Sequence, residues 1–428
     1  MRLFKDIKPS QRKWRKYDFG GPAFNLVIMM ALPLIVYYLY FAVHFNNGMP
    51  LPIENISFGP FNSFCQSIMP SWTAVALYLS WFSFQALLQA LLPGKISQGK
   101  ALKDGSHLSY KLNGLLSFII TLGTIAILIY FNIIDTAIIY NNLGALISVV
   151  MIFSLLMSIF LYFYGKKRSP DSERSGNIIH DFFMGSSLNP RIGSFDLKFF
   201  CEARPGLILW ILINASYMGL QYKLHGTVTT AMILVNIMQF WYILDYYLHE
   251  ETILTTMDIA YENFGFMLTF GDLAWVPFTY SLQALFLVNH LHHIPLWGAG
   301  LILLINIGGY FIFRQVNLQK HNFTFDAEKP IWGKKPEFIK TQRGTRLLAS
   351  GFWSWSRHFN YVGDILMATA WSLPTLFFTP VTYFYPIYFA VLLIHRERRD
   401  NKHCAIKYGE DWDRYCEKVP SRIIPKIY

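Results

Sequence analysis

Residues 139–165 read "IYNNLGALISVVMIFSLLMSIFLYFYG", a stretch without a single Asp, Glu, Lys or Arg. A helix needs about 20 consecutive apolar residues to cross the roughly 30 Å hydrocarbon core of a bilayer. Lys166, Lys167 and Arg168 follow at once, and basic residues of this kind collect at the cytoplasmic end of a span. The stretch therefore predicts a membrane-spanning helix whose C-terminal end faces the cytoplasm.

The composition extends this interpretation to the rest of the chain. Of the 428 residues, 53% are hydrophobic and only 15% are charged, which is too apolar for a soluble domain of this size. We therefore predict an all-α polytopic membrane protein with about ten transmembrane helices. The predicted spans lie near 22–45, 72–92, 113–133, 139–165, 206–224, 228–249, 263–288, 296–316, 361–379 and 380–395.

The basic residues support this topology. With ten spans, 36 of the 37 Lys and Arg fall on one side, and only Lys223 falls on the other. Because cytoplasmic loops are enriched in basic residues, both termini are expected in the cytoplasm. The net charge of +11 then follows from topology and from attraction to anionic lipid headgroups, so no nucleic-acid partner is expected. The four cysteines have no CxxC spacing, and no metal site is predicted.

No internal repeat or long low-complexity segment is evident, which predicts one integrated membrane domain with three parts. The first is a basic cytoplasmic tail (1–21). The second holds spans one to four with their loops (22–205), and the third holds spans five to ten and the functional pockets (206–428).

Polar side chains concentrate on the sixth predicted span, "NIMQFWYILDYYLHEE". Gln239, Tyr242, Tyr246 and His249 recur at three- and four-residue spacing, so they share one helical face, with Asp245 adjoining. Two interpretations stay open at this point: a hydrogen-bonded seam between helices, or the wall of a buried site.

The C-terminal stretch "LLIHRERRDNKHCAIKYGEDWDRYC" runs from an apolar span into a polar segment. Arg396 and Arg399 are three residues apart, a spacing suited to contacting a pyrophosphate. Lys407, Tyr408 and Tyr415 add a further cation and flat rings. Arginines at a helix end also anchor many membrane helices at the interface, and that alternative stays open.

Two further segments lie on the same predicted side. "GFWSWSRHFNYVGD" (351–364) combines small residues and aromatic rings with Arg357 and His358, and "RQVNLQKHNFTF" (314–325) adds Lys320. Three cationic and aromatic segments on one face favour an anionic cofactor that contains rings. No GxGxxG motif follows a strand, so a Rossmann site is not indicated.

Four motifs together resemble the membrane sterol reductases, the family of Δ14-sterol reductase, 7-dehydrocholesterol reductase and the lamin B receptor membrane domain. Besides 351–364 and "HRERRDNKHCAIKYGEDWDRYC", they are "LPGKISQGKALKDGSHLSYKLNG" (92–114) and "FGFMLTFGDLAWVPFTYSLQALFLV" (264–288). The resemblance is nearest to the Δ14 reductases. It implies a ten-helix fold with an NADPH pocket in the C-terminal half, beside a second pocket for a sterol that enters from the lipid.

The family's cofactor contacts transfer to matching positions of this chain. They are Lys320, Leu348, Trp353, Asn360, Tyr361, Asp400, Cys404, Ala405, Ile406, Lys407, Tyr408 and Tyr415. Thr324 stands where the family commonly has an arginine, which leaves open how strongly the adenosine phosphate is held.

The expected reaction is NADPH-dependent reduction of a ring carbon–carbon double bond, the 14,15 bond of an 8,14-diene sterol. Such a bond must be protonated before or during hydride transfer, so a general acid is needed. Tyr242 is the candidate acid, and Asp400 is its candidate proton source or orienting partner. Asp245, His249 and Glu250 are possible relay members.

Three alternatives remain at this stage. The segment "KYGEDWDRY" is similar to the cofactor region of isoprenylcysteine carboxyl methyltransferases. The motif "HLHH" (290–293) raises a di-iron enzyme, but such sites need several histidine clusters and this one stands alone on the predicted outer side. The third is a catalytically silent sterol-binding protein. The expected partners are a sterol and membrane lipids, and no obligate protein partner is inferred. The expected location is the inner membrane of a bacterium or the endoplasmic reticulum of a eukaryote.

Overall fold

The computed structural model describes residues 17–50, 58–102, 105–170 and 174–428. Most of the predicted tail (1–21) lies outside these residues. The described chain forms two compact units. The N-terminal unit comprises residues 17–293, with the gaps just given, and 377–382; the C-terminal unit comprises 294–376 and 383–428. The predicted division at residue 205 stays a prediction.

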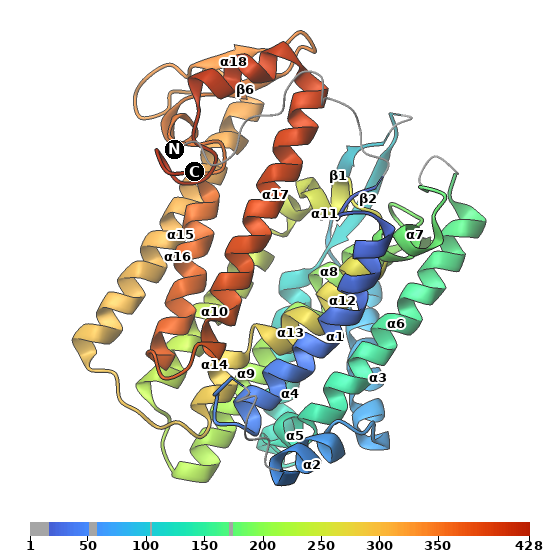
Figure 1. The fold of residues 1–428 in the computed structure, drawn as a ribbon, viewed down its shortest axis with the longest axis vertical. Coiled ribbons are helices and arrows are strands. Elements are labelled where there is room, and N and C mark those ends of the chain that lie inside the picture. The colour runs from blue at the N-terminus through green and yellow to red at the C-terminus, as the bar shows by residue number, and fades with distance from the viewer. Residues whose placement is uncertain (1–16, 51–57, 103–104, 171–173) are drawn as a thin grey trace. The chain divides into compact units, whose positions relative to one another are not determined.

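Helices dominate the N-terminal unit (Figure 1). They begin where the sequence places helix-starting residues: Pro22 and Pro205 occupy the first turns of α1 and α9, and Ser71 Oγ accepts a hydrogen bond from Ala74 N (3.1 Å) at the start of α3. The helices are α1 (Pro22–His44), α2 (Phe58–Ser67), α3 (Trp72–Leu91), α4 (Gly114–Tyr130), α5 (Ile138–Asn141), α6 (Leu143–Arg168), α7 (Ile178–Met184), α8 (Leu197–Ala203), α9 (Pro205–His225), α10 (Thr230–Leu248), η3 (Glu250–Thr255) and α11 (Met257–Ala260).

The predicted seventh span, 263–288, is a broken helix. It consists of α12 (Phe266–Phe270), the π-helical turn η4 (Gly271–Trp275), α13 (Val276–Thr279) and α14 (Leu282–Leu287). Pro277 removes a backbone donor, and π-helical turns interrupt the regular i→i−4 hydrogen bonding. The predicted span is therefore interrupted, and the sequence signal for the interruption was Pro277.

The chain also contains strands, which the all-α prediction did not include. Each described strand pairs antiparallel with its neighbour in the sequence: β1 (Lys95–Ala101) with β2 (His107–Leu112), β3 (Arg191–Ile192) with β4 (Phe195–Asp196), and β5 (Phe338–Lys340) with β6 (Arg346–Leu348). β1 is largely polar, and β3 to β6 contain only two or three residues each, so none of these strands has a hydrophobic run long enough to predict it.

Long helices organise the C-terminal unit. α15 packs along α16, and α16 packs along α17, while α18 and the β5–β6 pair lie at one end of these helices (Figure 1). The elements are α15 (Leu296–Phe325), η5 (Gly351–Ser354), α16 (Asn360–Ser372), η6 (Leu373–Thr375), η7 (Val381–Tyr383) at the boundary of the two units, α17 (Phe384–Tyr408) and α18 (Glu410–Lys418).

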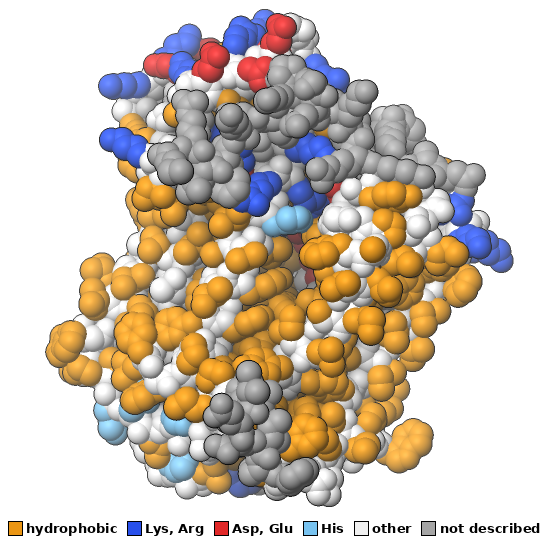
Figure 2. Space-filling model, in the orientation of Figure 1, with side chains coloured by type: hydrophobic (Ala, Val, Ile, Leu, Met, Phe, Trp, Pro, Cys, Tyr) orange, Lys and Arg blue, Asp and Glu red, His pale blue; other side chains and the backbone are white. Residues whose placement is uncertain are grey.

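The surface chemistry suits a lipid environment. Figure 2 shows hydrophobic side chains over the long helices of the C-terminal unit and charged side chains gathered around the end that holds α18. Leu301, Leu304, Ile307 and Phe311 of α15 are all exposed. Within the described residues, five helices are long and apolar enough to cross a membrane: α1, α3, α6, α10 and α15. The count of ten spans stays a prediction.

Candidate functional site

The end of the C-terminal unit that holds α18 brings together most of the predicted cofactor residues. They come from the end of α15, the segment from β6 to the start of α16, the last turns of α17, and α18. These elements are distant in the sequence, but their apolar side chains pack into two buried clusters.

Trp353 anchors the first part of this site. Its Nε1 donates to Val316 O of α15 (2.9 Å), and its ring is buried beside Leu348 and Phe359. The Lys320 ammonium lies 4.6 Å from the centre of the Trp353 ring, in reach of a cation–π interaction. Lys320 is therefore held over an aromatic surface, although its side chain is exposed to solvent.

Gly351 fixes the turn that carries Trp353, which leads to a first prediction. Its φ of +62° is in the left-handed region, and a Cβ there would lie 2.5 Å from Gln319 Oε1, the acceptor of the Phe352 backbone N–H. We expect Gly351→Ala to lower the free energy of unfolding by about 1–3 kcal/mol, because it combines backbone strain with a clash. Thermal melting of the detergent-solubilised protein measures this effect.

Gly344→Ala is the matched control. Gly344 has φ +78° in the turn between β5 and β6, but nothing lies within 4 Å of the position that a Cβ would occupy, so only the backbone strain applies. An equal loss of melting temperature in both variants would show that the contact with Gln319 contributes nothing.

Asp400 is the centre of the second part of the site. Its Oδ2 lies 3.2 Å from His358 Nε2 and 3.8 Å from the Cys404 thiol. Burial raises the pKa of Asp400, but the hydrogen bond and charge of His358, with the charges of Lys320 and His403, outweigh it and lower the pKa to about 2. Asp400 is therefore a carboxylate across the physiological pH range.

An aromatic wall lies beside Asp400. Ala405, Trp412 and Tyr415 are buried in one cluster, with Cys404 and Tyr408 packed against it. Burial raises the pKa of the Cys404 thiol and of the Tyr415 hydroxyl, and the Asp400 charge raises both further. These two side chains therefore stay protonated and can serve as neutral hydrogen-bond donors.

The remaining predicted cofactor residues occupy the same elements. Asn360 Nδ2 donates to Asn317 Oδ1 (3.4 Å), and the Tyr361 ring stacks on the His358 ring with centroids 5.0 Å apart. The other predicted contacts lie on α15 or α17: the Thr324 hydroxyl donates to Lys320 O (2.8 Å), the Lys407 ammonium lies 4.8 Å from the Tyr408 ring centre, and Arg396, Arg399 and Ile406 are half-buried.

The residues present fit a phosphate-bearing dinucleotide. Lys320, Arg396, Arg399 and Lys407 supply positive charge, and the buried rings supply flat surfaces. Within the described part of the chain, the buried atom Asn360 Oδ1 has no hydrogen-bond partner. Because an unpartnered buried polar atom costs roughly 1–3 kcal/mol, this oxygen is suited to contact a bound molecule.

His358 and the C-terminal segment 419–428 were not among the predicted site residues. The segment returns to the site: His358 N donates to Arg422 O (2.8 Å) and Ser356 Oγ donates to Ile423 O (2.6 Å). Arg422 also pairs with the buried Glu397 of α17 (3.2 Å). The cluster "SRHFNY" was the only sequence signal for His358, and its partners could not be read from the sequence.

The predicted polar face of α10 belongs to the N-terminal unit. Gln239 is fully buried and accepts hydrogen bonds from Trp210 and Asn214, as a seam between helices would require. Tyr242 is half-buried, with its ring centre 6.4 Å from that of Trp210. His249 Nδ1 lies 3.2 Å from Asp245 Oδ1. The seam interpretation therefore describes Gln239, while the roles of Tyr242, Asp245 and His249 stay predictions.

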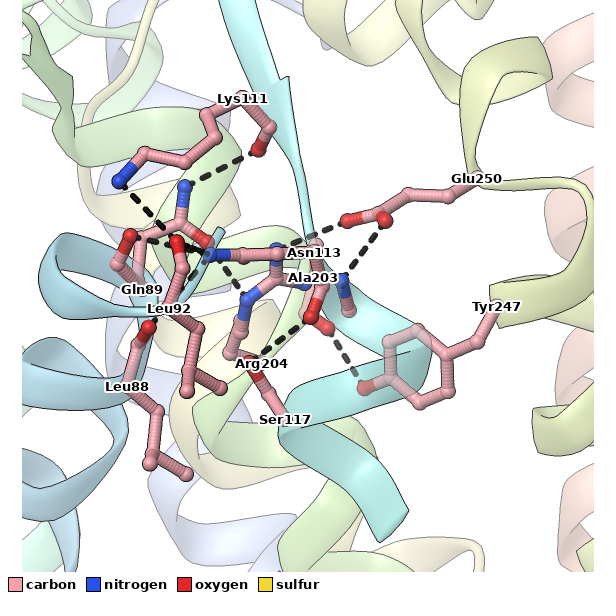
Figure 3. A network of polar contacts seen from close by, with 11 residues as sticks. Leu88, Gln89, Leu92, Lys111, Asn113, Ser117, Ala203, Arg204, Tyr247 and Glu250 are labelled. Atoms are coloured by element: carbon pink, nitrogen blue, oxygen red, sulfur yellow. Dashed lines mark hydrogen bonds and ion pairs between the residues drawn. The ribbon is translucent and has the colours of Figure 1, made fainter. Parts of the chain in front are cut away.

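Glu250 takes part in a buried polar network at the C-terminal end of α10 (Figure 3). Its Oε1 lies 2.8 Å from Arg204 Nη2, and its Oε2 accepts a hydrogen bond from Gly114 N (2.8 Å). Arg204 also donates to Gln89 (2.7 Å) and Asn113 (2.8 Å). Removal of either charged partner would leave an uncompensated buried charge. We therefore interpret this network as a structural one that stabilises the end of α10. The relay role of Glu250 stays a prediction.

An apolar cavity of about 380 Å³ lies elsewhere in the N-terminal unit. Its walls come from α3, α4, α6 and α9, and they include Leu77, Trp81, Leu128, Val150 and Leu212. Tyr242, Asp245 and His249 are not among its lining residues in the described chain. The cavity is therefore not the predicted catalytic pocket.

Known proteins match this chain along almost its whole length. A Delta(14)-sterol reductase of Methylotuvimicrobium alcaliphilum is 48% identical over 415 residues, which cover 97% of this chain and 96% of that protein. A Delta(14)-sterol reductase of Dictyostelium discoideum is 44% identical over 436 residues (99% of this chain and 94% of that protein). A Delta(14)-sterol reductase of Schizosaccharomyces pombe is 42% identical over 419 residues (96% and 97%).

The family model that matches is that of the ergosterol biosynthesis ERG4/ERG24 family, over residues 13–428. Together with the five apolar helices, this match identifies an integral membrane protein. The four motifs that suggested a sterol reductase thus lie within one continuous family match, and the chain belongs to the ergosterol biosynthesis ERG4/ERG24 family.

Proposed function

We propose that the protein is an NADPH-dependent Δ14-sterol reductase that reduces the 14,15 double bond of an 8,14-diene sterol. The observation that carries this proposal is the site around Asp400, where cations, buried rings and an ionised carboxylate from four separated segments meet. The near-full-length similarity to proteins named Delta(14)-sterol reductase supports the choice of substrate.

Different residues would bind different parts of the cofactor. Lys320, Arg396, Arg399 and Lys407 would contact the phosphates, with the cation of Lys320 kept in place by the Trp353 ring. Tyr408 and Tyr415 would face the rings of the cofactor. When bound, NADPH supplies the hydride.

The protein must supply the proton. A carbon–carbon double bond that carries no electron-withdrawing group accepts hydride poorly, because negative charge would develop on carbon without an electron sink. Protonation of the 14,15 bond instead gives a tertiary, allyl-stabilised cation at carbon 14. Tyr242 is the proposed general acid, and the surrounding apolar residues would keep water away from the cation.

Reduction of defined sterols tests the function directly. Purified protein would be incubated with NADPH and separately with an 8,14-diene, a 7-ene and a 24-ene sterol, and the products identified by mass. We expect reduction of the 8,14-diene alone, and faster with NADPH than with NADH. Reduction of the 7-ene instead would mean that the protein is a sterol reductase with a different substrate. No reduction of any sterol would overturn the proposal.

The phosphate role of Lys320 gives a second prediction. We expect Lys320→Ala to raise the apparent KM for NADPH by about 10- to 100-fold, the equivalent of one hydrogen bond to a charged group, with a smaller change in kcat. The reason is that a contact remote from the reacting carbon contributes mainly to ground-state binding. Steady-state kinetics at varied NADPH concentration measures both constants.

Lys335→Ala is the control for Lys320. Lys335 lies in the same unit and is exposed in an ion pair with Glu328 (2.7 Å). Its removal should leave both constants unchanged, because exposed ion pairs contribute little. If Lys320→Ala lowered kcat alone, Lys320 would belong to the chemical step rather than to phosphate binding.

The family match separates this function from the methyltransferase alternative. That alternative rested on the C-terminal segment, whereas the match extends over residues 13–428. Labelled NADPH competing with S-adenosylmethionine for the purified protein would test the cofactor choice.

We also propose that the sterol enters from the bilayer, and that the protein resides in the inner membrane of a bacterium or in the endoplasmic reticulum of a eukaryote.

A further inference from the structure

His358 occupies a position that the proposed function does not yet use. It lies in the segment between η5 and α16, with its side chain 12% exposed. Its backbone N–H donates to Arg422 O (2.8 Å), and the preceding Arg357 N–H donates to Ser421 O (3.0 Å). Its ring stacks on Tyr361. Both the backbone and the ring of His358 are therefore fixed before any ligand binds.

The contact with Asp400 has a defined direction. His358 Nε2 lies 3.2 Å from Asp400 Oδ2. Because an ionised carboxylate can only accept hydrogen bonds, Nε2 must carry the proton. The second ring nitrogen, Nδ1, is buried and has no hydrogen-bond partner within the described residues. Protonation of Nδ1 would complete an imidazolium beside the Asp400 charge.

We propose that His358 is a positioning residue that keeps Asp400 ionised and oriented, and that His358, rather than Asp400, stores the proton that this pair supplies to turnover. The proposal rests on the proposed reductase function. In each cycle the imidazolium gives its Nε2 proton to Asp400 Oδ2, and Asp400 then passes that same proton on to the group that protonates the substrate. The imidazole is then reprotonated from water.

The surroundings of Asp400 support this assignment of the proton. The described groups whose charges interact with Asp400 are Lys320 of α15, His403 and Cys404 of α17, and Tyr415 of α18, besides His358 itself. Lys320 and His403 favour the carboxylate, while Cys404 and Tyr415 stay neutral. An acid with a pKa of about 2 holds almost no proton at neutral pH, so Asp400 cannot be the store.

The sign of the pH dependence follows from this pKa. A carboxylate whose pKa is lowered contributes its favourable interactions above the ordinary Asp value, and loses them as the pH falls through about 2. Burial is the largest single effect on the pKa of Asp400 and raises it, and without the hydrogen bond and charge of His358 only the charges of Lys320 and His403 oppose it. We therefore expect His358→Gln to raise the pKa of Asp400 by about one unit or more.

Infrared spectroscopy of the cofactor-free protein tests this without any turnover. The protonated-carboxyl band that Asp400→Asn removes identifies Asp400, and its appearance is followed as the pH is lowered. We expect the band at a higher pH in His358→Gln than in the parent. An unchanged titration, or a parent protein already protonated at pH 5, would overturn the proposal.

Measurements of turnover in His358 variants are the second test. His358→Gln keeps an N–H donor but carries no titratable proton. We expect kcat to fall by something on the order of 10- to 100-fold, as for other hydrogen-bond partners that act through a functional residue, with NADPH binding changed much less. The pH dependence of kcat should differ from that of the parent, and added imidazole should restore part of the turnover of His358→Ala.

The outcomes separate this proposal from the function on which it rests. Parent protein that reduces no sterol contradicts the proposed function, while the infrared titration still decides the role of His358. Parental kcat and pH dependence in His358→Gln would overturn the proton-storage role. His321→Gln, a change at an exposed histidine of α15, is the control and should match the parent in both arms.

Discussion

Tyr242→Phe is expected to lower the rate of 8,14-diene reduction by about 10²–10⁴-fold while NADPH binding is retained. The substitution keeps the ring, its half-buried position and its packing near Trp210, and it removes the only proton that the side chain can give. A positioned general acid contributes a factor of this size. Steady-state reduction and a direct NADPH-binding measurement on the same preparation give the two values.

Tyr246→Phe is the matched control for this experiment. Tyr246 lies one turn further along the same face of α10 and packs against the buried cluster of Tyr110, Phe199 and Ile253. Its loss of a hydroxyl should change the rate only slightly. If Tyr242→Phe stays within a few-fold of the parent, or if both variants fall equally, the acid is another group and Tyr242 belongs to the polar seam between helices.

The apolar helices were predictable because burial in lipid leaves a strong sequence signal. The span predicted at 139–165 is the helix Leu143–Arg168, shifted because the polar residues Asn141 and Asn142 delay its start. The three basic residues at its other end continue the helix, since their long side chains can reach the interface from a helical backbone.

The short strands β1 and β2 were not predicted, because they lack such a strong sequence signal. β1 consists largely of Lys, Ser, Gln and Gly and buries only Ser97, so neither alternation nor an apolar run marks it. β2 does alternate, with Leu108, Tyr110 and Leu112 on one face, but six residues are too few to predict a strand in a chain of long apolar helices. The hairpin is held instead from outside, where Lys95 and Ser97 contact Glu251 of η3 (2.6 Å each). Such tertiary contacts have no local signature.

The composition of the candidate site was more predictable than its connections. The sequence indicated cations and rings on one face, and the structure places the Lys320 ammonium over the Trp353 ring. The pairing of His358 with Asp400 joins residues 42 positions apart in the sequence, and a spacing rule has no access to such a contact. The buried Glu250–Arg204 pair shows the same limit, because the sequence suggested Glu250 only as a relay residue.

Asp400→Asn is expected to reduce turnover at least as much as Tyr242→Phe, by about 10²–10⁴-fold or more, and also to weaken NADPH binding. The amide has nearly the shape of the carboxylate but carries no charge, so it no longer stabilises a protonated His358. An amide nitrogen turned toward His358 would also force the imidazole into the other tautomer, as neutralising the aspartate of a His–carboxylate pair does elsewhere. The kcat and the NADPH dissociation constant are measured separately, since the proposal assigns Asp400 to both.

Asp326→Asn is the control for the loss of one negative charge, because Asp326 is exposed at the end of α15 in the same unit. It should leave kcat and NADPH binding unchanged. A comparison of Asp400→Asn with His358→Gln tests whether the two residues act as one pair. His358→Gln should lower kcat with much less effect on NADPH binding, whereas Asp400→Asn should affect both. Because the two residues form one hydrogen-bonded pair, the double variant should be no slower than Asp400→Asn alone. A double variant whose losses multiply would mean that His358 and Asp400 act independently, and that the proton does not pass between them.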